Sequence, residues 1–85
     1  MHQLTYTKRA EKALLAMPRD SARLIRDKLR QLAENPHAAN SNATKLQGRA
    51  GVRLRVGDWR VIYEIVDDVL VILVLDIGPR GGIYS

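Results

Sequence analysis

The chain has 85 residues, with 14 Lys and Arg against nine Asp and Glu, a net charge of +5, and no cysteine. This length predicts a single domain over residues 1–85, and the lack of cysteine excludes disulfides and thiolate metal sites. The basic charge favours an acidic partner, either a nucleic acid or an acidic protein. The polar N-terminal segment predicts no signal peptide, and no apolar run is long enough to cross a bilayer, so we expect a cytoplasmic protein without membrane contact. His2 and His37 are far apart in sequence and lie in no cluster of metal ligands, so we expect neither a metal nor another cofactor.

The N-terminal part of the chain predicts a strand followed by two helices. Residues 2–6 alternate in polarity, which is typical of a short strand. Thr7 is the expected N-cap of a helix over residues 8–17. Pro18 suits the first turn of a second helix, which runs to Glu34 and ends at an Asn-Pro dipeptide. Apolar residues at helical spacing give each helix one apolar side: Ala10, Ala13, Leu14 and Met17 in the first, and Ile25, Leu29 and Leu32 in the second.

The rest of the chain predicts a loop and a β-meander. Residues 35–44 are rich in Asn, Ala and Ser, which indicates a loop. Alternating polar and apolar residues predict three strands: 51–56, 59–66 and 69–77. Turns at Gly57-Asp58 and Asp67-Asp68 would join them as antiparallel neighbours. The predicted fold class is therefore α+β, with a short N-terminal strand and a two-helix hairpin packed on one face of an antiparallel β-meander.

The first turn predicts an unusual pair of like charges. A two-residue turn at Gly57-Asp58 places Arg55 directly opposite Arg60, and alternation puts Arg53 on the same face. Like charges directly opposite each other on a sheet are destabilising, by roughly 0.2–1 kcal/mol. A sequence that keeps this pair is expected to hold the cations for an anion, and phosphate is the obvious candidate.

The second turn predicts how the last strand completes the two faces. A two-residue turn at Asp67-Asp68 pairs Val66 with Val69 and Arg60 with Leu75. One face is then apolar and should receive the helices: Val52, Leu54, Val56, Val61, Tyr63, Ile65, Leu70, Ile72 and Val74. The other face combines a cationic rim with an apolar floor: Arg53, Arg55, Arg60 and Glu64 over Ile62, Val71, Leu73 and Leu75. Such a face has the build of a binding surface.

Most of the net charge lies in one short segment. Between residues 45 and 60 there are one acid, Asp58, and five cations: Lys45, Arg49, Arg53, Arg55 and Arg60. Arginine suits bidentate contacts to phosphate. The simpler alternative is a solvated basic face that keeps a small protein soluble. The like-charge pair in the hairpin favours a binding function.

Three segments of the chain resemble one family. The string KLQG at residues 45–48, the string RLRVGDWRVIYEI at residues 53–65, and the end IGPR at residues 77–80 with Ile83-Tyr84 are together similar to the RelE/ParE toxin superfamily. Within that superfamily the RelE branch acts on messenger RNA in the ribosomal A site, and the ParE branch inhibits DNA gyrase. Both kinds of toxin are held inactive by a co-expressed antitoxin.

The resemblance implies a set of site residues and a RelE-like assignment. The RelE branch typically carries basic residues on the second strand, an arginine at the start of the third strand, an arginine after the fourth strand, and a tyrosine near the C-terminus. Those positions hold Arg53, Arg55, Arg60, Arg80 and Tyr84 here. The chain departs from the family where many members carry a strand lysine, because only arginines are present there. It also has Gly81-Gly82-Ile83 where many relatives are basic.

The implied function is that of the toxin of a type II toxin–antitoxin system, an endoribonuclease that cleaves mRNA on the ribosome. The implied partners are an acidic antitoxin, in a complex that can reach a heterotetramer or larger, and the mRNA and ribosome. Lys45 and Arg49 would contact RNA or the ribosome, or else the antitoxin. Two alternatives stay open: a gyrase inhibitor of the ParE type without nuclease activity, and an inactive toxin fold that only binds its antitoxin.

RNA cleavage by the 2′-OH of the substrate requires no metal. Arginines are suited to hold the phosphate and stabilise the charge that grows on it, but guanidinium is a poor general base. Tyr84 is a candidate base, although stacking on or orienting a nucleobase is the favoured role. Glu64 could act as a base, but pairing with an arginine fits it better.

Overall fold

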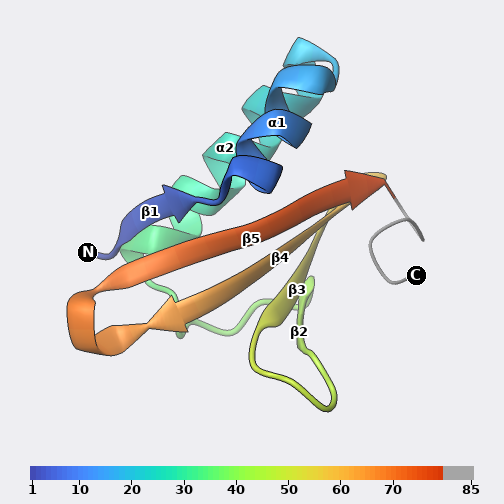
Figure 1. The fold of residues 1–85 in the computed structure, drawn as a ribbon. Helices are drawn as coiled ribbons and strands as arrows, with labels where there is room; N and C mark the ends of the chain where they lie inside the picture. Colours follow the sequence, from blue (N-terminus) through green and yellow to red (C-terminus); the bar gives the residue numbers. More distant parts are fainter. Residues whose placement is uncertain (80–85) are drawn as a thin grey trace.

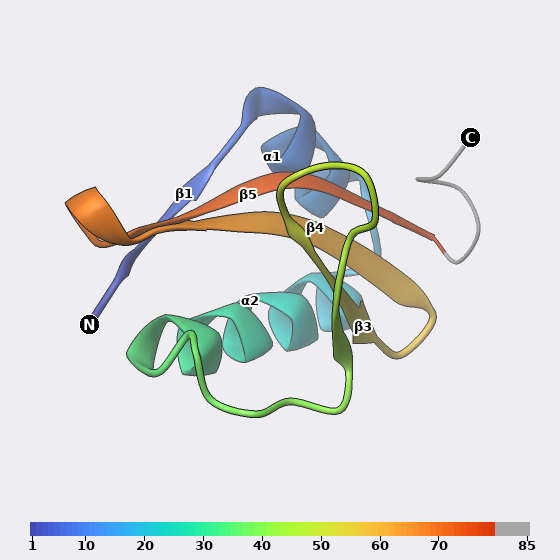
Figure 2. The same cartoon turned by 90° about the horizontal axis from the view of Figure 1, so that it is seen from below.

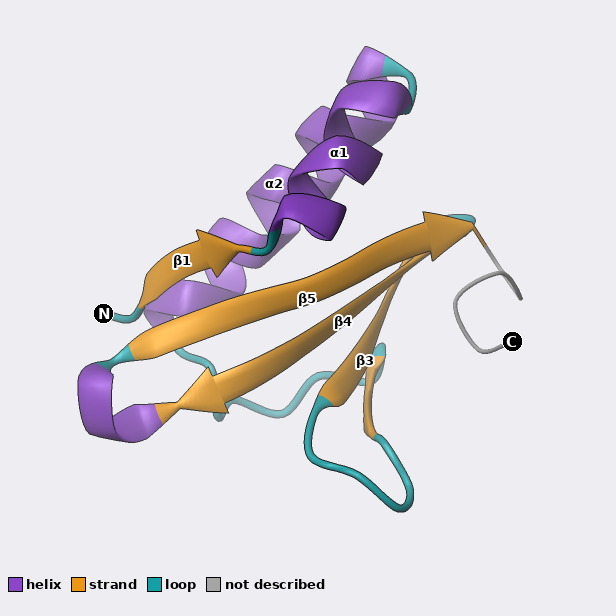
Figure 3. Cartoon of the chain, viewed as in Figure 1, coloured by secondary structure: helices purple, strands orange, loops and turns teal. Residues whose placement is uncertain are grey.

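A computed structural model describes residues 1–79 of the chain, which form two helices and a mixed five-stranded sheet (Figures 1 and 3). The strand order in the sheet is β1-β5-β4-β3-β2. The short strand β1 runs parallel to β5, and the other neighbours are antiparallel. The fold is therefore α+β, as the sequence predicts. In chain order the elements are β1 (Gln3–Tyr6), α1 (Lys8–Ala16), α2 (Arg19–Glu34), β2 (Ala43–Lys45), β3 (Val52–Val56), β4 (Trp59–Val66), a 3-10 helix (Asp67–Val69) and β5 (Val71–Pro79).

The ends of both helices follow the predicted local chemistry. The Thr7 hydroxyl accepts a hydrogen bond from the backbone N–H of Ala10 at 3.1 Å and donates one to the carbonyl oxygen of Leu75 at 2.7 Å. The cap therefore starts α1 and also ties it to β5. Pro18 is the N-cap of α2, and Asn35 is its C-cap. These boundaries confirm the predicted helical hairpin.

One hydrophobic core joins the helices to one face of the sheet. Ile25 and Leu29 of α2 are fully buried, and they belong to the same cluster as Val61 of β4 and Val74 of β5. Burial of each of these side chains contributes about 1.5–3 kcal/mol to the stability of the fold. Leu54, Val56, Tyr63 and Ile72 belong to the core as predicted. The opposite face of the sheet, which carries the alternate residues of β3 and β4, is called the outer face below.

The first hairpin has the predicted turn and register. Arg55 pairs with Arg60, Leu54 with Val61, and Val56 with Trp59. Gly57 has a φ of 58°, and no non-glycine residue of this turn has a positive φ. A positive φ at only the first of two loop residues is the pattern of a type II′ turn, whose twist matches that of the strands.

The predicted second turn is wrong, because the connection from β4 to β5 has four residues rather than two. Asp67–Val69 form a 3-10 helix, and Leu70 closes it in the left-handed region with a φ of 54°. Val66 therefore pairs with Val71 instead of Val69. Leu70, predicted to face the helices, is exposed. Since the register moves by two residues, the side chains of Val71 to Val74 stay on their predicted faces.

A β-bulge changes the register again further along β5. Tyr63 pairs with Val74, but its neighbour Ile62 pairs with Asp76, so Leu75 is the extra residue. Arg60 consequently opposes Gly78 instead of the predicted Leu75. The extra residue reverses the alternation, which carries Ile77 into the core.

The segment after α2 also differs from the prediction. It leads from the end of α2 across to β2 and β3, and can be followed in green in Figure 2. Its last residues are not a loop, because Ala43 and Thr44 belong to the edge strand β2, where they pair with Leu54 and Arg53. A strand of three residues is too short to show periodicity in the sequence.

Candidate functional site

Three arginines of the first hairpin share the outer face of the sheet. Arg55 and Arg60 are direct cross-strand partners, and Arg53 lies two residues before Arg55 on the same strand, opposite Ile62. Arg60 also opposes Gly78 of β5, which has no side chain to cover it. The hairpin therefore gathers the three predicted arginines at one end of the sheet, close to the point where β5 ends.

The contacts of Arg55 and Arg60 leave their positive charge uncompensated within residues 1–79. Arg55 Nη2 donates to Asn42 Oδ1 at 3.2 Å, and Arg60 Nη1 donates to the backbone oxygen of Trp59 at 3.1 Å. Both acceptors are neutral. They orient the guanidinium groups without supplying a counter-charge, which suits an anion-binding site.

The predicted apolar floor of the outer face agrees only in part with the structure. Ile62 lies on the outer face, yet only 2% of it is exposed. Val71, Leu73 and Leu75 are partly exposed. The bulge adds an acidic residue that the predicted register did not include, because Asp76 is the cross-strand partner of Ile62.

That carboxylate is already engaged. Asp76 Oδ1 accepts from the backbone N–H of Ile77 at 2.9 Å, and its Oδ2 lies 3.8 Å from Arg9 Nε. Within residues 1–79, no hydrogen bond or ion pair joins Asp76 to Arg55 or Arg60, whose partners are the neutral oxygens described above.

Lys45 and Arg49 lie apart from the Arg55–Arg60 pair. Lys45 ends the edge strand β2 and pairs with Val52, while Arg49 lies in the following loop. Together with Glu64 they line a hollow of about 350 Å³ near the far end of β4. The structure therefore places these two cations in a second basic area, separate from the Arg55–Arg60 pair.

Two of the predicted site residues, Arg80 and Tyr84, lie outside the described residues. The tyrosines within residues 1–79 have other roles. Tyr63 is in the core, and burial raises the pKa of its phenol. Burial also raises the pKa of Tyr6, although the charges of Arg26 and Arg30 oppose this shift. Both phenols are therefore poor general bases.

A cluster that sequence reasoning missed joins His2, His37 and Asp67. His2 Nε2 lies 2.9 Å from Asp67 Oδ1, and His37 Nε2 lies 3.0 Å from Asp67 Oδ2. The sequence indicated no partner for either histidine, so this contact was not predicted. These hydrogen bonds lower the pKa of Asp67. The residues are 30 and 65 positions apart from Asp67, so only the fold could reveal the cluster.

The described part of the chain contains neither a transmembrane helix nor a metal-ligand cluster. Over residues 1–79, no helix is both long and apolar enough to cross a membrane. In the same range, no group of three or more His, Cys, Asp or Glu side chains is arranged to hold a metal ion.

The fold is that of known toxins. The RelE of the archaeal RelE–RelB complex from Pyrococcus horikoshii OT3 superposes with a TM-score of 0.81 and 29% identity, over 95% of this chain and 97% of the other. The toxin in the intact Escherichia coli RelBE toxin–antitoxin complex gives a TM-score of 0.76 at 24% identity, over 94% and 98% of the two chains.

Sequence comparison shows the family. The model of the "ParE toxin of type II toxin-antitoxin system, parDE" matches residues 4–84, and the chain belongs to this family. The chain is thus a RelE-like toxin of the RelE/ParE superfamily. It is also 28% identical over 53 residues to a RelE-like toxin protein of Escherichia coli, a match that covers 62% of this chain and 56% of that protein.

Proposed function

We propose that the chain is the endoribonuclease toxin of a type II toxin–antitoxin pair, which cleaves mRNA on the ribosome and so inhibits translation. The observation that carries the proposal is the cross-strand pair of Arg55 and Arg60, whose side chains are oriented by neutral oxygens. Such a pair carries a repulsive cost in the free protein that a bound phosphate would remove. Arg53 would be the third cation on the same phosphate.

The proposed reaction uses the substrate's own 2′-hydroxyl as the nucleophile. Its oxygen loses its proton to a base and forms a bond to the adjacent phosphorus, while the bond from phosphorus to the 5′-oxygen breaks. The 5′-oxygen takes up a proton from solvent water, which leaves a 2′,3′-cyclic phosphate and a 5′-hydroxyl. Negative charge grows on the phosphoryl oxygens during this step, where Arg55 and Arg60 would stabilise it. Arg80, which follows the end of β5, would add a fourth cation.

The proton acceptor is assigned to no residue within 1–79. We favour an orienting role for Tyr84, with its ring stacked on a nucleobase. The variant Tyr84→Phe keeps the ring and should then retain cleavage, while Tyr84→Ala should lose roughly 10- to 100-fold. Equal loss in both variants would assign the function to the hydroxyl instead. The ribosome would hold the codon in position, which lowers the demand for a strong base.

The proposed protein partner is an acidic antitoxin. Two of the similar structures are complexes of a RelE with a RelB antitoxin. The cationic rim over the partly exposed apolar residues of the outer face would fit an amphipathic segment with acidic residues. Purification of the chain from its native operon should recover such a partner, and Lys45 and Arg49 are available to contact it or the RNA.

One experiment tests the proposed target. The chain is expressed from a tightly controlled promoter, and the 5′ ends of cellular mRNA are mapped while plasmid supercoiling is measured. We expect cuts in phase with codons and unchanged supercoiling. Gyrase–DNA breaks with intact mRNA would overturn the proposal and support the alternative of a ParE-type gyrase inhibitor. Toxicity with neither change would also overturn it.

A further inference from the structure

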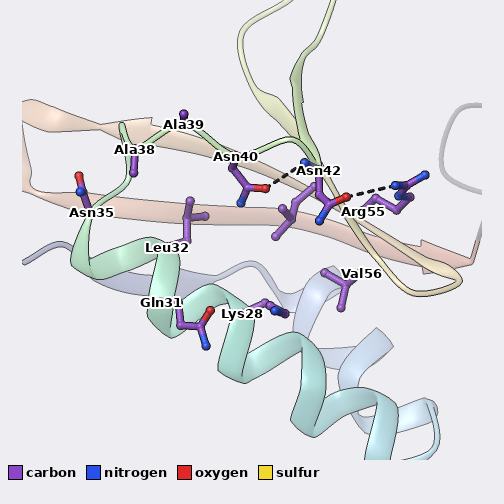
Figure 4. A pocket seen from close by; sticks show the side chains of 11 residues that line it. Lys28, Gln31, Leu32, Asn35, Ala38, Ala39, Asn40, Asn42, Arg55 and Val56 are labelled. Carbon is purple, nitrogen blue, oxygen red and sulfur yellow. Dashed lines mark hydrogen bonds between the residues drawn. The ribbon is translucent and has the colours of Figure 1, made fainter.

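A pocket lined by side-chain amides lies next to Arg55. It has a volume of about 200 Å³ and is enclosed by the C-terminal half of α2, the segment of residues 35–42 and the end of β3 (Figure 4). Four side-chain amides line it: Gln31, Asn35, Asn40 and Asn42. Each amide carries both a donor and an acceptor, so the pocket has a dense and mixed hydrogen-bonding capacity.

The base of the pocket is apolar. Leu32 of α2 and Leu54 and Val56 of β3 line it, and each is less than 10% exposed. Figure 4 shows Leu32 and Val56 on its two sides, with the amides of Asn40 and Asn42 between them along the covering segment. An apolar base with amides at its rim suits a flat heteroaromatic ring, which has apolar faces and polar edges.

The charge of the pocket favours an anionic ligand. Its two charged lining residues, Lys28 and Arg55, are both cations, and among the described residues that line it none is acidic. A ligand that combines a heteroaromatic ring with a negative group therefore fits better than a neutral or cationic one. A nucleotide has this combination.

A chain of hydrogen bonds connects the pocket to the candidate cleavage site. Asn40 Oδ1 accepts from the backbone N–H of Asn42 at 2.9 Å, which holds the turn of the segment. Asn42 then contacts Arg55 twice: its carbonyl accepts from the Arg55 backbone N–H at 2.9 Å, and its Oδ1 accepts from Arg55 Nη2 at 3.2 Å. Figure 4 shows this contact at one end of the pocket.

The same hydrogen bonds leave donors for a ligand. Asn40 and Asn42 use their amide oxygens, and within residues 1–79 their NH₂ groups donate to no protein atom. Over the same residues, the side-chain amide of Gln31 forms no hydrogen bond at all. These groups can be shared by the edge of a base without breaking a contact of the fold.

We propose that this amide-lined pocket is a nucleotide subsite, which takes the base of a nucleotide whose phosphate is held by Arg55. The inference rests on the proposed function, since it makes Arg55 common to the phosphate site and the base pocket. It adds that the amides read the base and thereby select where the RNA is cut. Asn42 is a positioning residue here, because it acts on the phosphate through Arg55.

The direct test is a nuclear magnetic resonance titration of the full-length chain with each of the four nucleoside 5′-monophosphates. Ribose 5-phosphate is the base-free control, with the same phosphate and sugar. We expect the side-chain NH₂ signals of Gln31, Asn40 and Asn42 to move with at least one nucleotide and to stay in place with ribose 5-phosphate. Signals that move equally with both, or with neither, would overturn the subsite; the second result is the one expected if a polypeptide occupies the pocket.

Two variants separate reading of the base from holding of the phosphate. Gln31 is an exposed residue of α2, and alanine is favourable in a helix, so the variant Gln31→Ala should keep the fold. It should weaken nucleotide binding by roughly fivefold, the effect of one hydrogen bond, and leave ribose 5-phosphate binding unchanged. Gln47→Ala removes an exposed amide outside the pocket and is the matched control. Equal binding by parent and Gln31→Ala would contradict base reading.

The cleavage profile distinguishes failure of the subsite from failure of the proposed function. In Gln31→Ala the nucleotide preference next to the cut should flatten, because the selecting contact is gone. If the parent cleaves RNA and Gln31→Ala keeps both its affinity and its preference, the subsite is wrong and the endoribonuclease stands. If the parent cleaves no RNA but the three amides still respond to nucleotides, the pocket is supported and the proposed reaction is wrong.

Discussion

The charged side chains at the two ends of strand β4 have different kinds of partners. At the start of the strand, Arg55 faces Arg60, and both side chains donate to neutral oxygens. At its other end, Asp67 is contacted by two imidazoles, with His2 Nε2 at 2.9 Å and His37 Nε2 at 3.0 Å. One hairpin thus leaves like charges side by side, and the other surrounds a single carboxylate with partners.

We interpret this difference as that between a proposed binding site and a structural contact. The imidazoles join the N-terminus, the segment after α2 and the connection to β5, and they add to the backbone hydrogen bonds from His2 to Ala33 and from Gln3 to Leu70. The arginine pair lies on two strands that are already hydrogen-bonded to each other, and placing the two like charges opposite each other has a repulsive cost. Groups kept at a cost to stability are expected where function requires them.

Neutralising Arg60 should have the largest effect and should change activity and stability in opposite directions. Arg60→Gln keeps a polar side chain, although a shorter one, and removes a charge from the proposed phosphate site. We expect mRNA cleavage to fall by roughly 100- to 1,000-fold, the loss typical of one transition-state contact. Relief of the repulsion should stabilise the fold by about 0.5 kcal/mol, or roughly 2–4 °C in Tm. Cleavage kinetics and thermal unfolding measure the two effects.

Arg23→Gln is the matched control, since Arg23 is an exposed arginine on α2 away from the hairpin. It should change neither cleavage nor Tm appreciably. A variant Arg60→Gln that loses stability together with activity would show that the arginine pair supports the fold, and the contrast between the two ends of β4 would then disappear.

Local sequence signals were enough to predict the structure of the hairpin that carries Arg55 and Arg60. Gly57-Asp58 has a turn chemistry that specifies a two-residue connection, and that fixes the register of every residue in the hairpin. The Arg55–Arg60 pair follows from the turn alone. The helix ends were predictable for the same reason, because Thr7 and Pro18 act on their own neighbours.

The structure at the other end of β4 depends on contacts between residues that are distant in sequence, so it could not be predicted. The four-residue connection around Asp67 includes Leu70 in a left-handed conformation that leucine rarely adopts. The bulge at Leu75 coincides with the hydrogen bond from Thr7, 68 residues earlier. The candidate site arginines on β3 and β4 could therefore be predicted from the sequence. Asn42 and its pocket became visible only in the folded structure, because a loop asparagine carries no periodic signal.

The turn at Gly57 offers a test of intermediate size. Gly57 has a φ of 58°, and a Cβ added there would meet nothing within 4 Å. Gly57→Ala should therefore cost only the backbone penalty of about 1 kcal/mol, which lowers Tm by about 4–8 °C. Asp58→Ala, at the turn position without a positive φ, is the control and should change Tm less. An unchanged Tm in Gly57→Ala would show that the hairpin does not depend on this turn, and the register of the arginine pair would need another cause.

The smallest effect is expected at Asp67. A single variant there tests both stability, through the Tm, and the proposed activity, through cleavage. Hydrogen bonds from His2 and His37 lower the pKa of this carboxyl below its ordinary value of 3.8. A carboxyl with a lowered pKa in the folded state contributes stability that is complete above its unfolded pKa and is lost as the pH falls through the folded one.

The difference in Tm between the parent and Asp67→Asn should therefore be present at pH 5 and should shrink as the pH is lowered below about 4. Asp68→Asn is the control, since no hydrogen bond or ion pair involves the Asp68 side chain within residues 1–79. Cleavage by Asp67→Asn should match the parent, because the variant changes the end of β4 that holds no part of the proposed site. A Tm difference that stays constant with pH would mean that the stabilising contact of Asp67 with the two histidines does not depend on the charge of its carboxylate. A loss of cleavage at unchanged stability would place Asp67 in the site, and the division of the hairpins into a binding end and a structural end would then be wrong.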